Sequence, residues 1–151
     1  MLVIGSDHGG LELKEVIKEL LVERQIAFTD LGTDNNASVD YPDFGERVAR
    51  AVATGTAQQG VLICGTGIGM SIVANKFPGV RAALVHDPFT AQMAKEHNNA
   101  NIIVLGGRVL QPEAARAILA TWLDTDFAGD RHQRRLDKIA RIENEIRSGK
   151  F

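Results

Sequence analysis

The sequence predicts an α/β fold: a doubly wound, Rossmann-like parallel sheet of five strands in a three-layer sandwich, with an extra C-terminal helix. Two observations lead to this prediction. Short apolar segments rich in branched side chains alternate with longer segments of helical periodicity, and glycine, proline or aspartate separates them. Such alternation favours parallel strands joined by right-handed helical crossovers. We therefore expect ligands to bind outside the carboxyl ends of the strands.

The first part of the chain contains two strand–helix pairs. Residues 2–6 form a short apolar strand, and a turn of sequence DHGG leads into an amphipathic helix over residues 11–23. Residues 27–31 are predicted to form the second strand. A polar loop containing the sequence DYPD follows, and the next helix is expected over about residues 44–53.

The third strand carries the most informative segment of the chain, residues 60–76. Its apolar residues 61–64 suit a strand buried on both faces, and the sequence GTGIG follows at once before a helix begins. A strand that passes through glycines into a helix directs backbone N–H groups, and the positive end of the helix dipole, at the sheet edge. The segment predicts a site for an anion.

The last part of the chain adds two more strand–helix pairs and a final helix. Strands are predicted over residues 80–85 and 101–105, and helices from Pro88 to about residues 97–99 and over residues 112–123. Asp87 is positioned to cap the first of these helices, with Pro88 in its first turn. The final helix, about residues 130–148, has an apolar stripe at helical spacing, and we expect it at a subunit interface.

Composition limits the function classes. The 151 residues carry a formal net charge of −2, with 44% hydrophobic and 24% charged residues, which suits a single globular domain over residues 1–151. This charge argues against a nucleic-acid-binding surface, and a single cysteine argues against a disulfide framework. The start of the chain shows no basic leader, and no apolar run approaches the roughly 18 residues that span a membrane. We expect a cytoplasmic protein with neither nucleic-acid nor membrane partners.

Reactive and polar side chains cluster at the predicted strand ends. Asp7 and His8 follow the first strand, Asp40 and Tyr41 lie in the loop after the second, Cys64 and Thr66 flank the end of the third, and Arg108 follows the fifth. Because parallel strands end at one edge of the sheet, these side chains are candidates for one site.

Cys64 has two possible roles. A lone intracellular cysteine is most often a small hydrophobic residue of a strand. At the start of a glycine loop, however, the helix N-terminus would favour the thiolate, which can act as a nucleophile or as a base. Arg131 and Arg135 also have two readings, because they share a face of the last helix: they form a solvated basic turn, or they clamp one anion. The glycine loop favours the functional reading in both cases.

Six segments, in order along nearly the whole chain, resemble the family of sugar-phosphate isomerases that comprises type B ribose-5-phosphate isomerase and the galactose-6-phosphate isomerase subunits. These segments are GSDHGG, DYPDF, ICGTGIGMSIVANK, KEHNNAN, GGRV and RHQRR. The resemblance implies interconversion of an aldose phosphate and a ketose phosphate through an enediolate. It implies no metal and no organic cofactor, and a homodimer or homotetramer whose subunits share the active site.

The resemblance also implies roles for individual residues. Cys64 is the base that removes the proton, Thr66 shuttles protons, and His97 opens the cyclic sugar. Asp7 and Tyr41 hold sugar hydroxyls, and Asn98 contacts the reacting end. The amides of Gly65, Gly67, Ile68 and Gly69 hold the enediolate, and the phosphate is gripped by His8, Arg108, Arg131 and Arg135.

One branch of the family uses a glutamate of the following helix as the base in place of the cysteine. Met70 occupies that position here, so the chain resembles the cysteine branch. The resemblance assigns no role to His86 or His132. His97 has a structural alternative as a helix C-terminal cap, and Tyr41 as a packing residue of the turn.

Three alternatives stay open at the level of sequence. The substrate is most simply ribose 5-phosphate, but galactose 6-phosphate, allose 6-phosphate or a tetrulose phosphate would need the same groups. A dinucleotide-binding module would use the glycine loop and Asp87, although the spacing G-x-G-x-G differs from the usual fingerprint. A flavodoxin-like non-enzymatic domain would need neither the thiol nor the arginine pair.

Overall fold

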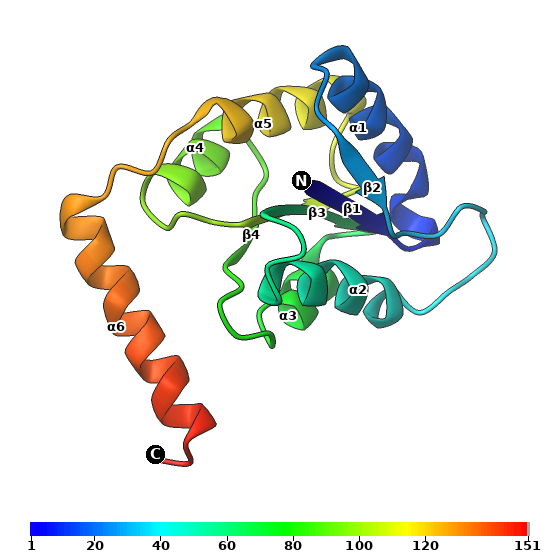
Figure 1. Ribbon diagram of the computed structural model, residues 1–151. Coiled ribbons are helices and arrows are strands. Elements are labelled where there is room, and N and C mark those ends of the chain that lie inside the picture. The colour runs from blue at the N-terminus through cyan, green and yellow to red at the C-terminus, as the bar shows by residue number, and fades with distance from the viewer. Residues whose placement is uncertain (151) are drawn as a thin grey trace.

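The computed structural model describes residues 1–150 and contains one sheet of five parallel strands (Figure 1). All neighbouring strands pair in parallel, so their carboxyl ends meet at one edge. The spatial order is β2-β1-β3-β5-β4, and the direction in which strands are added to the sheet reverses between β1 and β3. Their bounds are Leu2–Ser6 (β1), Phe28–Asp30 (β2), Gln59–Cys64 (β3), Ala82–Leu84 (β4) and Ile102–Gly106 (β5). The doubly wound fold that the sequence predicts is confirmed.

Helices cover both faces of the sheet and make the three-layer sandwich (Figure 1). Helices α1, α4 and α5 pack on one face, and α2 and α3 pack on the other. The helices are α1 (Leu11–Glu23), α2 (Tyr41–Ala53), α3 (Ile68–Ala74), α4 (Pro88–Glu96), α5 (Pro112–Asp124) and α6 (Asp130–Arg147), and a short 3-10 turn, η1 (His8–Gly10), precedes α1. None of the helices in residues 1–150 is both long enough and apolar enough to cross a membrane.

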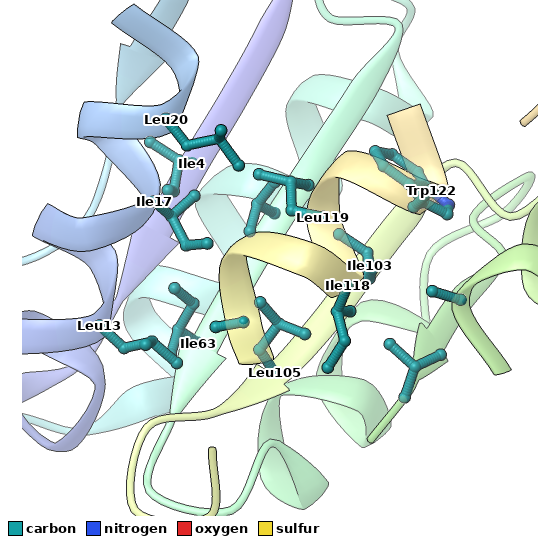
Figure 2. Packing of buried hydrophobic residues seen from close by; sticks show 14 of the residues in the cluster. Ile4, Leu13, Ile17, Leu20, Ile63, Ile103, Leu105, Ile118, Leu119 and Trp122 are labelled. Atoms are coloured by element: carbon teal, nitrogen blue, oxygen red, sulfur yellow. The ribbon is translucent and has the colours of Figure 1, made fainter. Parts of the chain in front are cut away.

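The larger hydrophobic core lies between the sheet and helices α1, α4 and α5 (Figure 2). Strand residues such as Ile63 and Ile103 contribute to it, and Ile17 and Trp122 approach from the helices; all four are fully buried. A second core lies under α2 and α3. Because β1, β3 and β5 are buried on both faces, the turns that follow them are held on a rigid platform.

Several predicted boundaries differ from the structure, and those of α2 and β4 have a clear local cause. Helix α2 begins at Tyr41 rather than near residue 44, because Pro42 fits the first helical turn, where its missing N–H has no intrahelical partner to lose. Strand β4 spans three residues rather than residues 80–85. On the outer side of β4, the Asn75 side chain accepts from the Ala82 N–H and donates to the Ala82 carbonyl, both at 2.9 Å. These bonds occupy the backbone groups that a further strand would need.

The last helix lies outside the sandwich. Helix α6 begins at Asp130, as the sequence predicts, and projects away from the sheet (Figure 1). Of its residues, only His132 and Leu136 are buried, whereas Ile139, Ile142 and Ile146 are each about half exposed. Most of the apolar stripe that the sequence analysis identified is therefore uncovered in the single chain.

Candidate active site

The turns after β1, β3 and β5 meet at the carboxyl edge of the sheet. They approach so closely that side chains would not fit: a Cβ on Gly10 would lie 2.5 Å from the carbonyl oxygen of Ile63, and one on Gly107 would lie 2.6 Å from that of Gly9. The Gly107 N–H also donates to the Cys64 carbonyl at 2.8 Å. The glycines thus allow three turns to pack against one another, and they bring the turn after β1 beside the end of β3.

The glycine loop wraps its own amides around Cys64 and Thr66. The Gly67 N–H donates to Cys64 Sγ at 3.2 Å, and the Ile68 N–H donates to Thr66 Oγ1 at 3.3 Å. Gly67 has a positive φ of 80°, and a Cβ there would lie 2.5 Å from a methyl group of Leu84, so only glycine suits this turn. The two amides that the sequence predicted to be free for an anion therefore point at the sulfur and the hydroxyl.

Asp7 and His8 are both held by backbone amides. Asp7 is buried, and its Oδ1 accepts from the Gly10 N–H at 3.0 Å, whereas Oδ2 accepts no hydrogen bond from residues 1–150. His8 Nδ1 accepts from the Val39 N–H at 3.2 Å. Because Nδ1 is the acceptor, the proton of the neutral ring lies on Nε2, which is then a donor toward solvent or a ligand.

Arg108 and Tyr41 lie next to these turns. The guanidinium of Arg108 extends across the backbone of Gly9 and Gly65: Cβ atoms built there would lie 3.4 and 3.2 Å from its terminal nitrogens. The ring of Tyr41 lies against Gly69, where a Cβ would come within 2.6 Å of its carbons. Both side chains are exposed and so available to a ligand.

Lys14 supports this edge, and the sequence analysis did not identify it. Its side chain is 1% exposed, and Nζ donates to the Thr33 carbonyl at 2.5 Å and pairs with both oxygens of Asp30 at 3.0 and 2.8 Å. The pKa of Asp30 lies below its ordinary value: burial raises it, but hydrogen bonds from Lys14, the Gly32 N–H and Lys18 outweigh that effect. Lys14 thereby anchors the loop that carries Val39 to His8.

Four predicted site residues lie at the opposite, amino edge of the sheet. Helix α4 runs back from the carboxyl edge, so His97 and Asn98 at its end lie just before β5 begins. The start of α6 packs there, with Arg131 and Arg135 exposed and without an ion-pair partner in residues 1–150. The five residues of β5, at about 3.3 Å each, place the two edges about 16 Å apart. One chain therefore does not bring these four residues to Cys64.

The structure also explains two other residues from the sequence analysis. Asp87 caps α4, as predicted: its Oδ1 accepts from the Thr90 N–H at 2.7 Å and from the Thr90 hydroxyl at 3.0 Å. A helix cap accounts for this carboxylate without a nucleotide ribose. His132 is buried and stacks on His97, a contact that its spacing of four from the buried Leu136 could have suggested.

Comparison with known proteins agrees with this fold. The profile of the family described as Ribose/Galactose Isomerase matches residues 2–139. The Clostridium thermocellum ribose-5-phosphate isomerase B structure superposes with a TM-score of 0.94 at 50% identity, covering 96% of this chain and 98% of that one.

Two relatives of the chain are named for different substrates. Ribose-5-phosphate isomerase B of Escherichia coli is 44% identical over 142 residues, which cover 94% of this chain and 95% of the relative. D-erythrulose-4-phosphate isomerase of Pectobacterium atrosepticum is 41% identical over 145 residues, with 95% of each covered.

These findings define an enzyme of the sugar-phosphate isomerase class. The chain belongs to the Ribose/Galactose Isomerase family, as the six sequence segments indicated.

Proposed function

We propose that this enzyme interconverts ribose 5-phosphate and ribulose 5-phosphate through an enediolate. The relatives named ribose-5-phosphate isomerase B, at 44% and 50% identity, support this substrate. The observation that carries the chemistry is the thiol of Cys64, which lies in a glycine loop with an N–H directed at its sulfur. An N–H donated to sulfur stabilises negative charge there, which suits a thiolate base.

The isomerisation moves a proton between two adjacent carbons. In this proposal, Cys64 removes the proton from C2 of the open aldose, and the same proton, or one from solvent, returns to C1. Thr66, bonded through Oγ1 to the loop, moves a hydroxyl proton between O1 and O2. The amides of Gly65, Gly67, Ile68 and Gly69 would hold the enediolate oxygen; in the structure the Gly67 N–H donates to the Cys64 sulfur and the Ile68 N–H to the Thr66 hydroxyl.

The phosphate and the sugar hydroxyls are held by the neighbouring turns. His8 presents its Nε2–H, because Nδ1 accepts from Val39, and Arg108 extends its guanidinium across the neighbouring Gly9. A guanidinium and an imidazole donor together suit a phosphate dianion. Asp7 Oδ2 and the phenol of Tyr41 are the groups at this edge that would bond sugar hydroxyls.

The remaining four residues complete the site from a second subunit. His97 would be the acid–base group that opens the furanose, Asn98 would contact the reacting end, and Arg131 and Arg135 would bind the phosphate. Within one chain they lie at the amino edge of the sheet, which the length of β5 separates from the carboxyl edge by about 16 Å. A two-fold dimer that places the amino edge of one subunit against the carboxyl edge of the other would assemble two whole sites.

Two separate apolar surfaces support such a dimer. One lies around the carboxyl edge and includes Ile68, Ile72 and Val109, each more than half exposed. The other is the uncovered stripe of α6. Exposed apolar side chains on this scale commonly mark an interface, and a two-fold axis pairs each surface with the unlike surface of its partner. We further infer a cytoplasmic location, which a single cysteine without a disulfide suits.

A second candidate substrate is a four-carbon ketose phosphate. It is favoured by the D-erythrulose-4-phosphate isomerase relative, whose 41% identity is close to the 44% of the ribose-5-phosphate enzyme. Galactose 6-phosphate and allose 6-phosphate would use the same base and donors in a deeper site.

The test is turnover by the purified protein on ribose 5-phosphate, ribulose 5-phosphate, allose 6-phosphate, galactose 6-phosphate and erythrulose 4-phosphate, with a chelator present. The proposal expects ribose 5-phosphate and ribulose 5-phosphate to be the best substrates, without a metal requirement. Preferred turnover of another sugar would reassign the substrate. The enediolate mechanism would be refuted if the protein neither turned over any of these sugars nor exchanged their C–H protons with solvent.

A further inference from the structure

The end of α4 and the start of α6 meet through two histidine rings. The rings of His97 and His132 stack with their centroids 4.1 Å apart and an angle of 12° between their planes. His132 is 5% exposed, whereas the His97 side chain is 37% exposed. One face of the His97 ring is therefore covered by His132, while the ring stays accessible to a substrate.

This contact lies where α6 joins the rest of the fold. The Ala128 N–H donates to the Glu96 carbonyl at 3.0 Å, and the chain then turns sharply through Gly129 and Asp130, which have φ values of 69° and 46°. Among the residues of α6, only His132 and Leu136 are buried. The turn places the His132 ring directly on the ring of His97, the C-cap residue of α4.

The charges around the pair favour a neutral His132. Burial lowers the pKa of His132, and His97, Arg131 and Arg135 lower it further; Glu96 acts in the opposite direction. Glu96 lies 3.7 Å from His97 Nε2. These groups come from both helices of the contact, and a neutral His132 places no second positive charge against His97.

We infer that His132 is a positioning residue that holds the His97 ring in the plane needed for opening the cyclic sugar. This inference rests on the proposed function. An exposed imidazole at a helix end rotates about two side-chain bonds, and its terminal torsion has broad minima. A parallel ring at 4.1 Å confines that rotation, so the acid–base nitrogen stays aligned with the sugar oxygens.

Ring opening affects only part of the reaction, which makes the role of His132 separable. In ribofuranose 5-phosphate the O1 proton must leave, the C1–O4 bond breaks, and O4 takes up a proton. Ribulose 5-phosphate is open-chain, because its O5 carries the phosphate and cannot close a furanose. Exchange of its C1 proton with solvent needs the Cys64 base and the phosphate grip, but no ring opening.

The experiment compares His132→Leu, which fills the contact with an apolar side chain but removes the ring, with His132→Phe, which keeps a ring. Gln133→Ala is the matched control, because Gln133 is exposed and its side chain bonds only Asp137 among residues 1–150, at 2.7 Å. Each variant is assayed for kcat and KM on ribose 5-phosphate and for deuterium uptake from D2O at C1 of ribulose 5-phosphate. Circular dichroism establishes that each variant is folded, and His132→Met replaces His132→Leu if the latter is not.

The inference expects His132→Leu to lower kcat on ribose 5-phosphate by about tenfold or more, with KM and deuterium uptake within about twofold of wild type. His132→Phe should recover most of the loss, and Gln133→Ala should match wild type. Equal losses of turnover and exchange, or a raised KM, would show that His132 only docks α6 and would overturn the inference. Wild-type kinetics for His132→Leu, or a His132→Phe as impaired as His132→Leu, would overturn it too.

A failure of the proposed function looks different in the same assays. If the wild-type protein neither isomerises ribose 5-phosphate nor exchanges the C1 proton of ribulose 5-phosphate, the function and the inference fall together. If wild type does both, the ratio of turnover to exchange in the variants decides the role of His132 alone.

Discussion

Replacing Lys14 with methionine tests how the structure holds the loop beside the active site. Lys14 is fully buried in the first turn of α1, and its ammonium binds the Thr33 carbonyl and the Asp30 carboxylate. Methionine has a similar length and volume, so the substitution removes the charge and its hydrogen bonds without opening a large cavity. The expected result is a folded but less stable protein.

The magnitude follows from the contacts. The hydrogen bond to the Thr33 carbonyl, at 2.5 Å, is charge-assisted, and such bonds contribute about 1.5–3 kcal/mol. Asp30 is not left alone, because Lys18 at 3.1 Å and the Gly32 N–H at 2.9 Å still bind it. We therefore expect Lys14→Met to lower the free energy of unfolding by about 2–3 kcal/mol and the melting temperature by roughly 5–10 °C.

The assay is thermal and urea unfolding at fixed protein concentration, with Lys18→Met as the control. Lys18 binds the same carboxylate from the surface, so its loss should cost less than about 1 kcal/mol. A Lys14→Met as stable as wild type, or a Lys18→Met equally destabilised, would refute the reasoning.

Asp30 sets the pH dependence of the difference in unfolding free energy between wild type and Lys14→Met. Its folded pKa is depressed, so its contribution to stability is complete above the ordinary value of 3.8 and is lost as the pH falls through the folded value. Lys14 is the first of the partners that depress this pKa. The gap between wild type and Lys14→Met should be constant above about pH 5 and narrow below pH 4. A gap that widens in acid would contradict this account.

Three further predictions concern catalysis. Cys64→Ala should reduce kcat by about 10²–10⁴-fold while inhibition by inorganic phosphate is unchanged, since a base acts in the transition state. If steady-state kinetics found a kcat near that of wild type, Cys64 would be excluded as the base. Arg135→Ala should raise KM by about tenfold or more with little effect on kcat, because one charge-assisted phosphate contact is lost; an unchanged KM would remove Arg135 from the grip. In Gly69→Ala the new Cβ meets the Tyr41 ring, 2.6 Å away, so KM should rise while differential scanning calorimetry finds the melting temperature within about 4 °C of wild type; a large loss of stability would mean that the tyrosine cannot move aside.

The layout of the fold could be predicted because local pattern and tertiary burial agree. Strands β1, β3 and β5 are buried on both faces, so their continuous apolar runs mark them clearly. The edge strands β2 and β4 are short, and their ends depend on contacts such as Asn75 with Ala82, which no local pattern encodes. The early start of α2 is a similar case, since a proline is compatible with both a loop and a first helical turn.

The candidate site could be predicted only in part. Strand ends identify Asp7, His8, Cys64 and Arg108 directly, because parallel topology brings them to one edge. His97 entered through the family resemblance, and the direction of α4 then places it at the other edge. The contact of Lys14 with Thr33 joins residues 19 apart through a loop, so the sequence carried no signal for it.

We propose that each active site is built from two subunits. Cys64→Ala removes the base from one half of the site, and the double change Arg131→Ala with Arg135→Ala removes the clamp from the other. Each variant alone should be nearly inactive at low ribose 5-phosphate.

The decisive measurement is the activity of the mixed dimer, isolated with two different affinity tags. One of its two sites then combines an intact Cys64 with intact arginines from the other subunit, so we expect about half the activity of the wild-type dimer. A mixed dimer no more active than its parents would show that each site lies within one chain.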